Sequence, residues 1–247
     1  MVKMITSKQN ALIKEIRSLS DKKNRDKLGL FIIEGVKPVK EAVALGIDIK
    51  VIVGTEKGLN DIHVKDAIIE IVTEDVFNYI SEEKTPQGVL AVAFKPENQL
   101  VSPVGSALLL DGVSDPSNVG AIIRTAAAAG YNYIYTTTDC ADPYSQKAVR
   151  SSMSGVFRVR VVRADIDALL DAINLPLVVA DMDGESVFDL TLNCAHCLVI
   201  GSEGHGVSDK VLSKAKYVVK IPMDNGVESL NAAVSAGILM YSLKNKQ

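Results

Sequence analysis

Apolar runs alternate with amphipathic stretches along the first hundred residues. Ahead of the first run, residues 7–19 begin with a serine and place Leu12, Ile13, Ile16 and Leu19 on one face of a predicted helix. Four runs rich in β-branched residues predict strands between residues 30 and 94, namely LFIIEGV, KVIVGT, AIIEIVT and GVLAVAF. Helical stretches such as KPVKEAVALG and TEDVFNYIS separate them. This pattern predicts a small α/β domain.

The second half of the chain has a different pattern. Residues 95–105 (KPENQLVSPVG) contain two prolines and a glycine among polar residues, which predicts a linker and places a domain boundary between residues 1–97 and 98–247. Beyond it, five runs are apolar throughout: ALLLDGV, YNYIYTTT, PLVVADM, CLVIGS and YVVKIPM. Such runs are typical of parallel strands that helices cover on both faces. The second domain is therefore expected to be a parallel-sheet α/β domain.

Two predicted helices in this half are apolar on nearly every side. They span residues 118–130, which end at Gly130, and residues 229–241. The first should be buried and closely packed. The second, close to the end of the chain, needs cover from more than one direction, so it lies either at a subunit interface or in the middle of its own domain.

Composition indicates a globular protein outside the membrane, with 47% hydrophobic and 23% charged residues. No apolar run reaches the roughly 18 residues that span a bilayer, and MVKMITSKQN lacks the apolar core of a secretory signal. We therefore expect a cytoplasmic protein. Three cysteines, an odd number, predict reduced thiols rather than a disulfide framework.

Positive charge is concentrated in two places although the net charge is −3. Residues 1–40 carry ten Lys or Arg and four Asp or Glu, and residues 144–163 carry basic residues and no acid. Local basic patches on an acidic protein predict contacts with phosphates. The alternative is that both clusters are solvated faces that keep the protein soluble.

Three constellations carry candidate chemistry. In the first, a turn-rich loop from Asp111 to Gly120 leaves a strand and leads into the helix whose only charge is Arg124. Open α/β sheets bind ligands where a strand, a loop and a helix meet in this way. A guanidinium in apolar surroundings needs a partner, which is either a ligand or an internal carboxylate.

The second constellation is LVIGSEGHG, where a strand runs into three glycines and Glu203. Its G-x-x-G-x-G order differs from dinucleotide and phosphate-loop fingerprints, so alone it is equally consistent with a tight turn. The third is KIPMDNGVESLN, in which the last helix opens with Ser229 and Asn231. Helix openings present free amides and polar side chains, although Ser229 could serve only as a cap.

Taken together, the three constellations resemble the signature motifs of the SpoU/TrmH-type RNA methyltransferases of the SPOUT class. The series reads DxxxDPxNxGxxxRTA, then GSEGxG, then IPM…SLNxAVSAGILxY. Residues 142–162 also resemble the family's segment between the first two motifs, and residues 6–94 resemble the L30-like substrate-binding domain of several members. The resemblance covers nearly the whole chain.

The resemblance implies an N-terminal L30-like α/β domain and a C-terminal parallel-sheet domain with a deep trefoil knot, a rare exception to unknotted chains. It also implies a homodimer and the cofactor S-adenosyl-L-methionine. Carried over residue by residue, it assigns catalytic roles to Asn118, Arg124, Glu203, Ser229 and Asn231. It assigns cofactor binding to Ala180, Gly201, Gly204, Ile221, Met223 and Leu230.

The expected activity is therefore methylation of a ribose 2′-hydroxyl in RNA, with ribosomal RNA favoured over transfer RNA by the L30-like domain. One alternative is a transfer RNA 2′-O-methyltransferase, and another is a non-catalytic RNA-binding or ribosome-assembly protein. A metal site at Cys194-Ala195-His196-Cys197 is a third alternative, because Cys-x-x-Cys can bind zinc. No second ligand pair exists and the apolar run CLVI follows, so we expect thiols packed in a strand and no metal.

Overall fold

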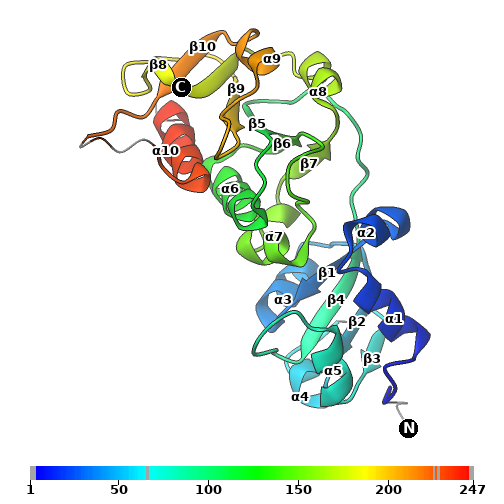
Figure 1. The fold of residues 1–247 in the computed structure, drawn as a ribbon. Coiled ribbons are helices and arrows are strands. Elements are labelled where there is room, and N and C mark those ends of the chain that lie inside the picture. The colour runs from blue at the N-terminus through cyan, green and yellow to red at the C-terminus, as the bar shows by residue number, and fades with distance from the viewer. Residues whose placement is uncertain (1–3, 65–66, 225, 227–228, 245–247) are drawn as a thin grey trace. The chain divides into compact units, whose positions relative to one another are not determined.

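The computed structural model describes residues 4–64, 67–224, 226 and 229–244. They form two compact units, each with its own sheet (Figure 1). The first contains the chain up to Pro96 together with Tyr144–Arg150, and the second contains Glu97–Pro143 and the described residues from Ser151 onwards. Residues 144–150 therefore belong to the first unit although the chain on both sides of them belongs to the second.

The first unit is built on a mixed four-stranded sheet with the order β1-β4-β2-β3. The β4 strand runs antiparallel to both β1 and β2, whereas β2 and β3 are parallel. All four strands predicted for this half are confirmed: β1 Leu30–Glu34, β2 Ile49–Gly54, β3 Ile69–Ile71 and β4 Val89–Phe94.

Helices α1 and α5 pack beside each other in the first unit, and their apolar residues share one core cluster with alternate residues of the sheet. The helix predicted from residue 7 begins later, because the Asn10 side chain accepts from the Leu12 N–H and caps it. The helices of this unit are α1 Ala11–Ser18, α2 Lys22–Leu28, α3 Val36–Ala44, α4 Glu56–Leu59, α5 Glu74–Ile80 and, running to its border, α7 Gln146–Ser151.

The second unit contains a six-stranded sheet, all parallel, in the order β10-β8-β9-β5-β6-β7. Its strands are β5 Ala107–Asp111, β6 Tyr133–Thr136, β7 Arg160–Arg163, β8 Leu177–Ser186, β9 Cys197–Gly201 and β10 Tyr217–Lys220. The five predicted strands and their parallel pairing are confirmed. The β7 strand was not predicted, because this short edge strand begins and ends with arginine.

The strand order reverses between β5 and β9, so the carboxyl ends of these strands flank the switch point at which open α/β sheets bind ligands. Two long helices, α6 Pro116–Ala129 and α10 Ala232–Lys244, pack against each other and begin close to this edge (Figure 1). The remaining helices are η1 Gly155–Phe157, α8 Ile166–Ala172 and α9 Asp209–Leu212. Within the described residues, no helix is both long and apolar enough to cross a bilayer.

Local sequence explains how α6 begins and ends. The Asp115 side chain accepts from the Ser117 N–H and Pro116 occupies the first turn, so the helix starts directly after the β5 loop. It stops at Gly130, which adopts a left-handed conformation with φ 89°. These signals place Asn118 in the first turn of α6, next to the carboxyl end of the sheet.

Candidate active site

A hydrogen-bonded network joins one residue from each of the three sequence motifs. The Asn118 side-chain amide donates to Glu203 Oε1, and the Asn118 Oδ1 accepts from the Asn231 Nδ2 at 3.0 Å. These residues come from the first turn of α6, the loop after β9 and the residue before α10. Residues separated by more than eighty positions therefore meet at the switch point of the sheet.

The network fixes the orientation of its central amide. The Asn118 nitrogen donates to the Glu203 carboxylate, and the Asn118 oxygen accepts from the Asn231 amide. Rotating the Asn118 amide by half a turn would therefore break both hydrogen bonds. Asn231 is held in turn, because its Oδ1 accepts from the Ala233 and Val234 N–H groups at 3.0 and 3.3 Å and caps α10. This geometry presents a preorganised polar edge.

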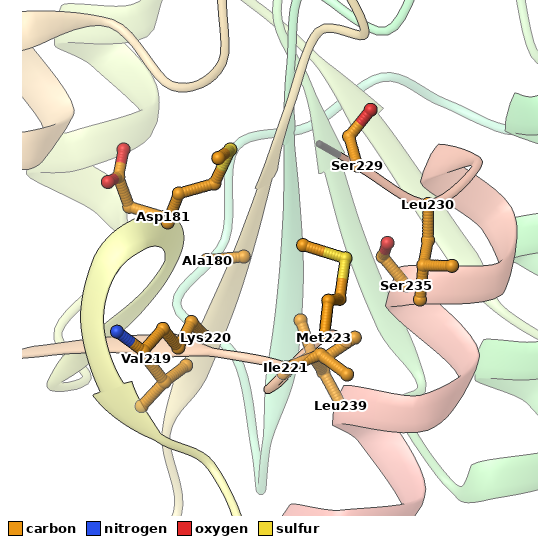
Figure 2. Close-up of a pocket in the computed structure, with 11 residues that line it drawn as sticks. Ala180, Asp181, Val219, Lys220, Ile221, Met223, Ser229, Leu230, Ser235 and Leu239 are labelled. Carbon is orange, nitrogen blue, oxygen red and sulfur yellow. The ribbon is translucent and has the colours of Figure 1, made fainter. Parts of the chain in front are cut away.

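A cavity lies beside this edge, between the middle of β8, the end of β10 and the first half of α10 (Figure 2). It holds about 480 Å³ of empty space, part of it open to solvent. Figure 2 shows Met223 between Ala180 on one side and Leu230 and Ser235 on the other. The lining residues are Ala180, Asp181, Met182, Val219, Lys220, Ile221, Met223, Ser229, Leu230, Ser235 and Leu239.

This cavity brings together four of the six residues predicted to bind the cofactor, namely Ala180, Ile221, Met223 and Leu230, and it adds Ser229 from the catalytic set. Sequence reasoning missed the other six lining residues, Asp181, Met182, Val219, Lys220, Ser235 and Leu239. Asp181 lies next to Ala180 on the same strand. The i, i+4 spacing of Ser235 and Leu239 puts both on one side of α10, which is a signal that could have found them.

Gly201 and Gly204 do not line this cavity. Gly201 ends β9, and a Cβ there would lie 2.2 Å from the Gly206 carbonyl carbon, so the glycine lets the loop fold back onto the strand. The Ser202 and Gly206 backbones exchange two hydrogen bonds across this turn. Gly204, at the exposed tip of the same loop, lines a second cavity instead.

The second cavity is polar and acidic. It holds about 990 Å³ of empty space that includes open solvent, and three carboxylates line it: Asp111, Asp139 and Glu203. Asp111 is buried, and its Oδ2 accepts from the Ser208 N–H at 2.8 Å, which ties the end of β5 to the start of α9. Glu203 therefore borders this cavity while it also belongs to the hydrogen-bonded network.

Arg124 is exposed, so the expectation of an enclosed guanidinium is wrong. Helical periodicity reports only which side of a helix is apolar, and the Arg124 side chain is exposed although its neighbours Ile122 and Ile123 are buried. No described residue forms a hydrogen bond or ion pair with its side chain. At 100° per residue, Arg124 also points about 120° away from Asn118 around the helix. Its guanidinium is thus free to contact something outside the described chain.

The cysteine and histidine cluster is a packed core. Cys197 is fully buried in β9, and burial raises the pKa of its thiol above the ordinary range. The buried His196 Nε2 lies 2.7 Å from the Tyr131 hydroxyl, and burial lowers the pKa of this imidazole. Cys194 is exposed. Among the described residues, no three His, Cys, Asp or Glu side chains are close enough to hold a metal ion.

Comparison with known families now adds to the geometry. Residues 105–241, which contain all three motifs and both cavities, match the model of the SpoU rRNA Methylase family. The chain belongs to the SpoU rRNA methylase family. Residues 10–91 match a second model, the MRM3-like substrate binding domain. The SpoU-type assignment made from the motifs is confirmed, and so is the presence of a separate substrate-binding part.

Individual SpoU relatives are similar over nearly the full chain. The 23S rRNA (guanosine(2553)-2′-O)-methyltransferase RlmP of Bacillus subtilis is 33% identical, over 98% of this chain and 100% of the relative. The 23S rRNA (uridine(2479)-2′-O)-methyltransferase of Streptomyces viridochromogenes is 29% identical, over 96% of this chain and 90% of the relative. The AdoMet-bound rRNA methyltransferase from Sinorhizobium meliloti superposes with a TM-score of 0.87 at 30% identity, over 98% and 97% of the two chains.

Proposed function

We propose that this SpoU methylase transfers a methyl group from S-adenosyl-L-methionine to a ribose 2′-hydroxyl of ribosomal RNA. The observation that carries the proposal is the network of Asn231, Asn118 and Glu203, which lies between an apolar cavity and a polar one. The similarity to two 23S rRNA 2′-O-methyltransferases over at least 96% of the chain supports the same reaction. We also propose a cytoplasmic location, in keeping with a ribosomal RNA substrate.

The chemistry of the first cavity fits the cofactor. Apolar side chains such as Ile221, Met223 and Leu230 suit an adenine ring, and the carboxylate of Asp181 with the hydroxyls of Ser229 and Ser235 suits its charged and hydroxylated parts. When bound, S-adenosyl-L-methionine supplies a methyl group on a positively charged sulfur. We assign the binding of the cofactor to Ala180, Ile221, Met223 and Leu230, with Gly201 and Gly204 shaping the adjoining loop.

The remaining task of the protein is to align the ribose oxygen with the methyl group and to favour loss of its proton. An arginine guanidinium keeps its proton at neutral pH, so it is not suited to act as the general base. We therefore assign the exposed Arg124 to binding a phosphate or ribose of the RNA next to the reacting nucleotide. Asn118, Glu203, Ser229 and Asn231 position the nucleotide.

Three features of the family complete the proposal. We place a deep trefoil knot in the C-terminal part of the parallel sheet. We divide the chain functionally into an RNA-binding part, residues 1–97, and a catalytic part, residues 98–247, in keeping with the two family models. We also propose a homodimer. Val234 and Tyr241 on the mostly apolar α10 are 51% and 44% exposed, and a second subunit would cover them.

The test is transfer of labelled methyl from S-adenosyl-L-methionine to unmodified ribosomal and transfer RNA, followed by nuclease mapping of 2′-O-methylated positions. Label in ribosomal RNA supports the proposal. Mapping then identifies the methylated nucleotide, which is a guanosine for one of the two relatives and a uridine for the other. Label in transfer RNA alone contradicts the substrate. Cofactor binding without label in naked RNA or in ribosomal particles indicates the non-catalytic alternative.

A matched pair of variants tests the role of Arg124. Arg124→Ala should abolish transfer and leave cofactor affinity unchanged, because the side chain lines neither cavity. The control is Lys214→Ala, which removes an exposed positive charge elsewhere in the second unit and should transfer normally. Retained activity in Arg124→Ala would contradict its assigned role without affecting the assignment of the reaction.

A further inference from the structure

An exposed tyrosine on the first unit is not explained by packing. Tyr79 is in the last turn of α5, where Val76, Phe77 and Ile80 occupy the core and leave Tyr79 facing outward. Its side chain is 41% exposed, and its hydroxyl forms no hydrogen bond with a described residue. Burial of apolar surface therefore does not account for an aromatic side chain at this position.

Two cations lie over the ring. The Lys8 Nζ and the Arg17 Cζ each lie 5.6 Å from the Tyr79 ring centroid. Lys8 also forms an ion pair with Asp75 at 2.9 Å, whereas Arg17 has no carboxylate partner among the described residues. Helix α1, which carries Arg17, packs directly beside α5, so the guanidinium and the ring are held on neighbouring helices (Figure 1).

The surrounding surface adds positive charge. Lys14 is exposed three residues before Arg17, on the same side of α1. Lys22 and Lys23 are exposed at the start of α2, and neither has a carboxylate partner among the described residues. An exposed aromatic ring with a free guanidinium beside it and lysines further along is the combination that binds unpaired nucleotides, since bases stack on the ring and phosphates contact the cations.

We propose that Tyr79, Arg17 and Lys8 form a stacking site for an unpaired base of the RNA substrate. The site rests on the proposed function, and it defines which face of the first unit contacts the RNA and by which chemistry. The substrate-binding family model, residues 10–91, spans both Arg17 and Tyr79 and assigns no role to either. The base stacks on the ring of Tyr79, and Arg17 binds the adjoining phosphate.

The experiment measures binding of the full-length protein to two fluorescent twelve-nucleotide probes, oligoadenylate and an abasic ribose-phosphate oligomer of equal charge. The native protein should bind oligoadenylate more tightly, because only this probe can stack. Tyr79→Leu retains the bulk of the side chain and should weaken oligoadenylate binding by about 5- to 100-fold while abasic binding stays unchanged. Tyr79→Phe should retain the native preference.

Arg17→Ala separates the phosphate contact from stacking. It should weaken binding of both probes and lower the slope of log affinity against log salt by about 0.7. The matched control is Phe94→Leu, which removes an aromatic side chain of similar exposure, 43%, from the same unit. This variant should bind both probes like the native protein, since no cation is found over the Phe94 ring among the described residues.

Equal affinity of the native protein for both probes, or unchanged oligoadenylate binding in Tyr79→Leu, would overturn the stacking site. Loss of binding only in Arg17→Ala would overturn it too, in favour of a pure phosphate contact. Neither result affects the proposed function, which methyl transfer to ribosomal RNA tests separately. Thermal melts of each variant test whether loss of fold is the cause. The melting temperature should stay unchanged, because the side chains of Arg17, Tyr79 and Phe94 are exposed.

Discussion

Gly201→Ala should disrupt the loop that carries Glu203. The added Cβ would lie 2.2 Å from the Gly206 carbonyl carbon, about 1.2 Å short of an ordinary contact, and the obstructing atoms belong to the backbone. The loop must therefore move away from the end of β9. That movement strains two hydrogen bonds, from the Ser202 N–H to the Gly206 oxygen at 2.9 Å and from the Gly206 N–H to the Ser202 oxygen at 3.0 Å.

The expected loss in unfolding free energy follows from these contacts. Overpacking of this kind costs about 1–3 kcal/mol, and each weakened hydrogen bond adds up to about 1 kcal/mol. A total of roughly 1–5 kcal/mol corresponds to a fall in melting temperature of about 2–20 °C for a chain of this length. Glu203 moves with the loop, so cofactor affinity and methyl transfer should fall as well.

Thermal melts and cofactor titration of the full-length protein check this prediction. The control is Gly204→Ala, since its Cβ would meet nothing within 4 Å and its unfolding free energy should change by less than about 0.5 kcal/mol. The reasoning is refuted if Gly201→Ala matches Gly204→Ala in melting temperature and the native protein in cofactor affinity. Such a result would mean that the loop relaxes without cost.

Three further predictions follow from the site and the core. Asn118→Asp replaces the donor to Glu203 by a second carboxylate, and the two groups repel each other while both are ionised. Transfer should be reduced roughly tenfold near pH 8 and less at pH 6, whereas a rate profile parallel to the native one would contradict the contact. Burial lowers the pKa of His196, so below about pH 6.5 the unfolded chain binds a proton that the folded chain does not. The unfolding free energy from urea titration should therefore fall as the pH is lowered below about 6.5, and His196→Gln should reduce that fall. Dialysis against a chelator should leave the melting temperature unchanged, because the Cys197 thiol is enclosed in β9; a lower melting temperature would indicate a bound metal.

Strands and helices with strong apolar patterns were predictable because a buried element needs apolar residues at several neighbouring positions of the sequence. The five predicted strands of the second sheet are apolar throughout, and all five pair in parallel. The β7 strand escaped because arginines begin and end it at the sheet edge, where polar residues are tolerated. Local pattern thus reports burial well and sheet edges poorly.

The candidate site was predictable only through the family motifs. Asn118, Glu203 and Asn231 are far apart in the sequence, and no local rule indicates that their side chains share hydrogen bonds. The exposure of the Arg124 side chain had no local signal either, because it depends on how α10 and η1 pack against α6. Contacts of this kind are properties of the tertiary structure, not of the helix itself.

Residues 144–150 belong to the first unit although the chain on both sides of them belongs to the second, and this affects how chimeras of such proteins should be built. The Tyr144 ring lies 5.1 Å from the Phe31 ring, which is almost fully buried, and Arg150 forms an ion pair with Glu83. A transplant of residues 1–96 alone would carry Phe31 without its cover. Chimeras between relatives should therefore exchange both pieces together, and swaps at a single crossover should yield less stable hybrids than swaps that include the short insert.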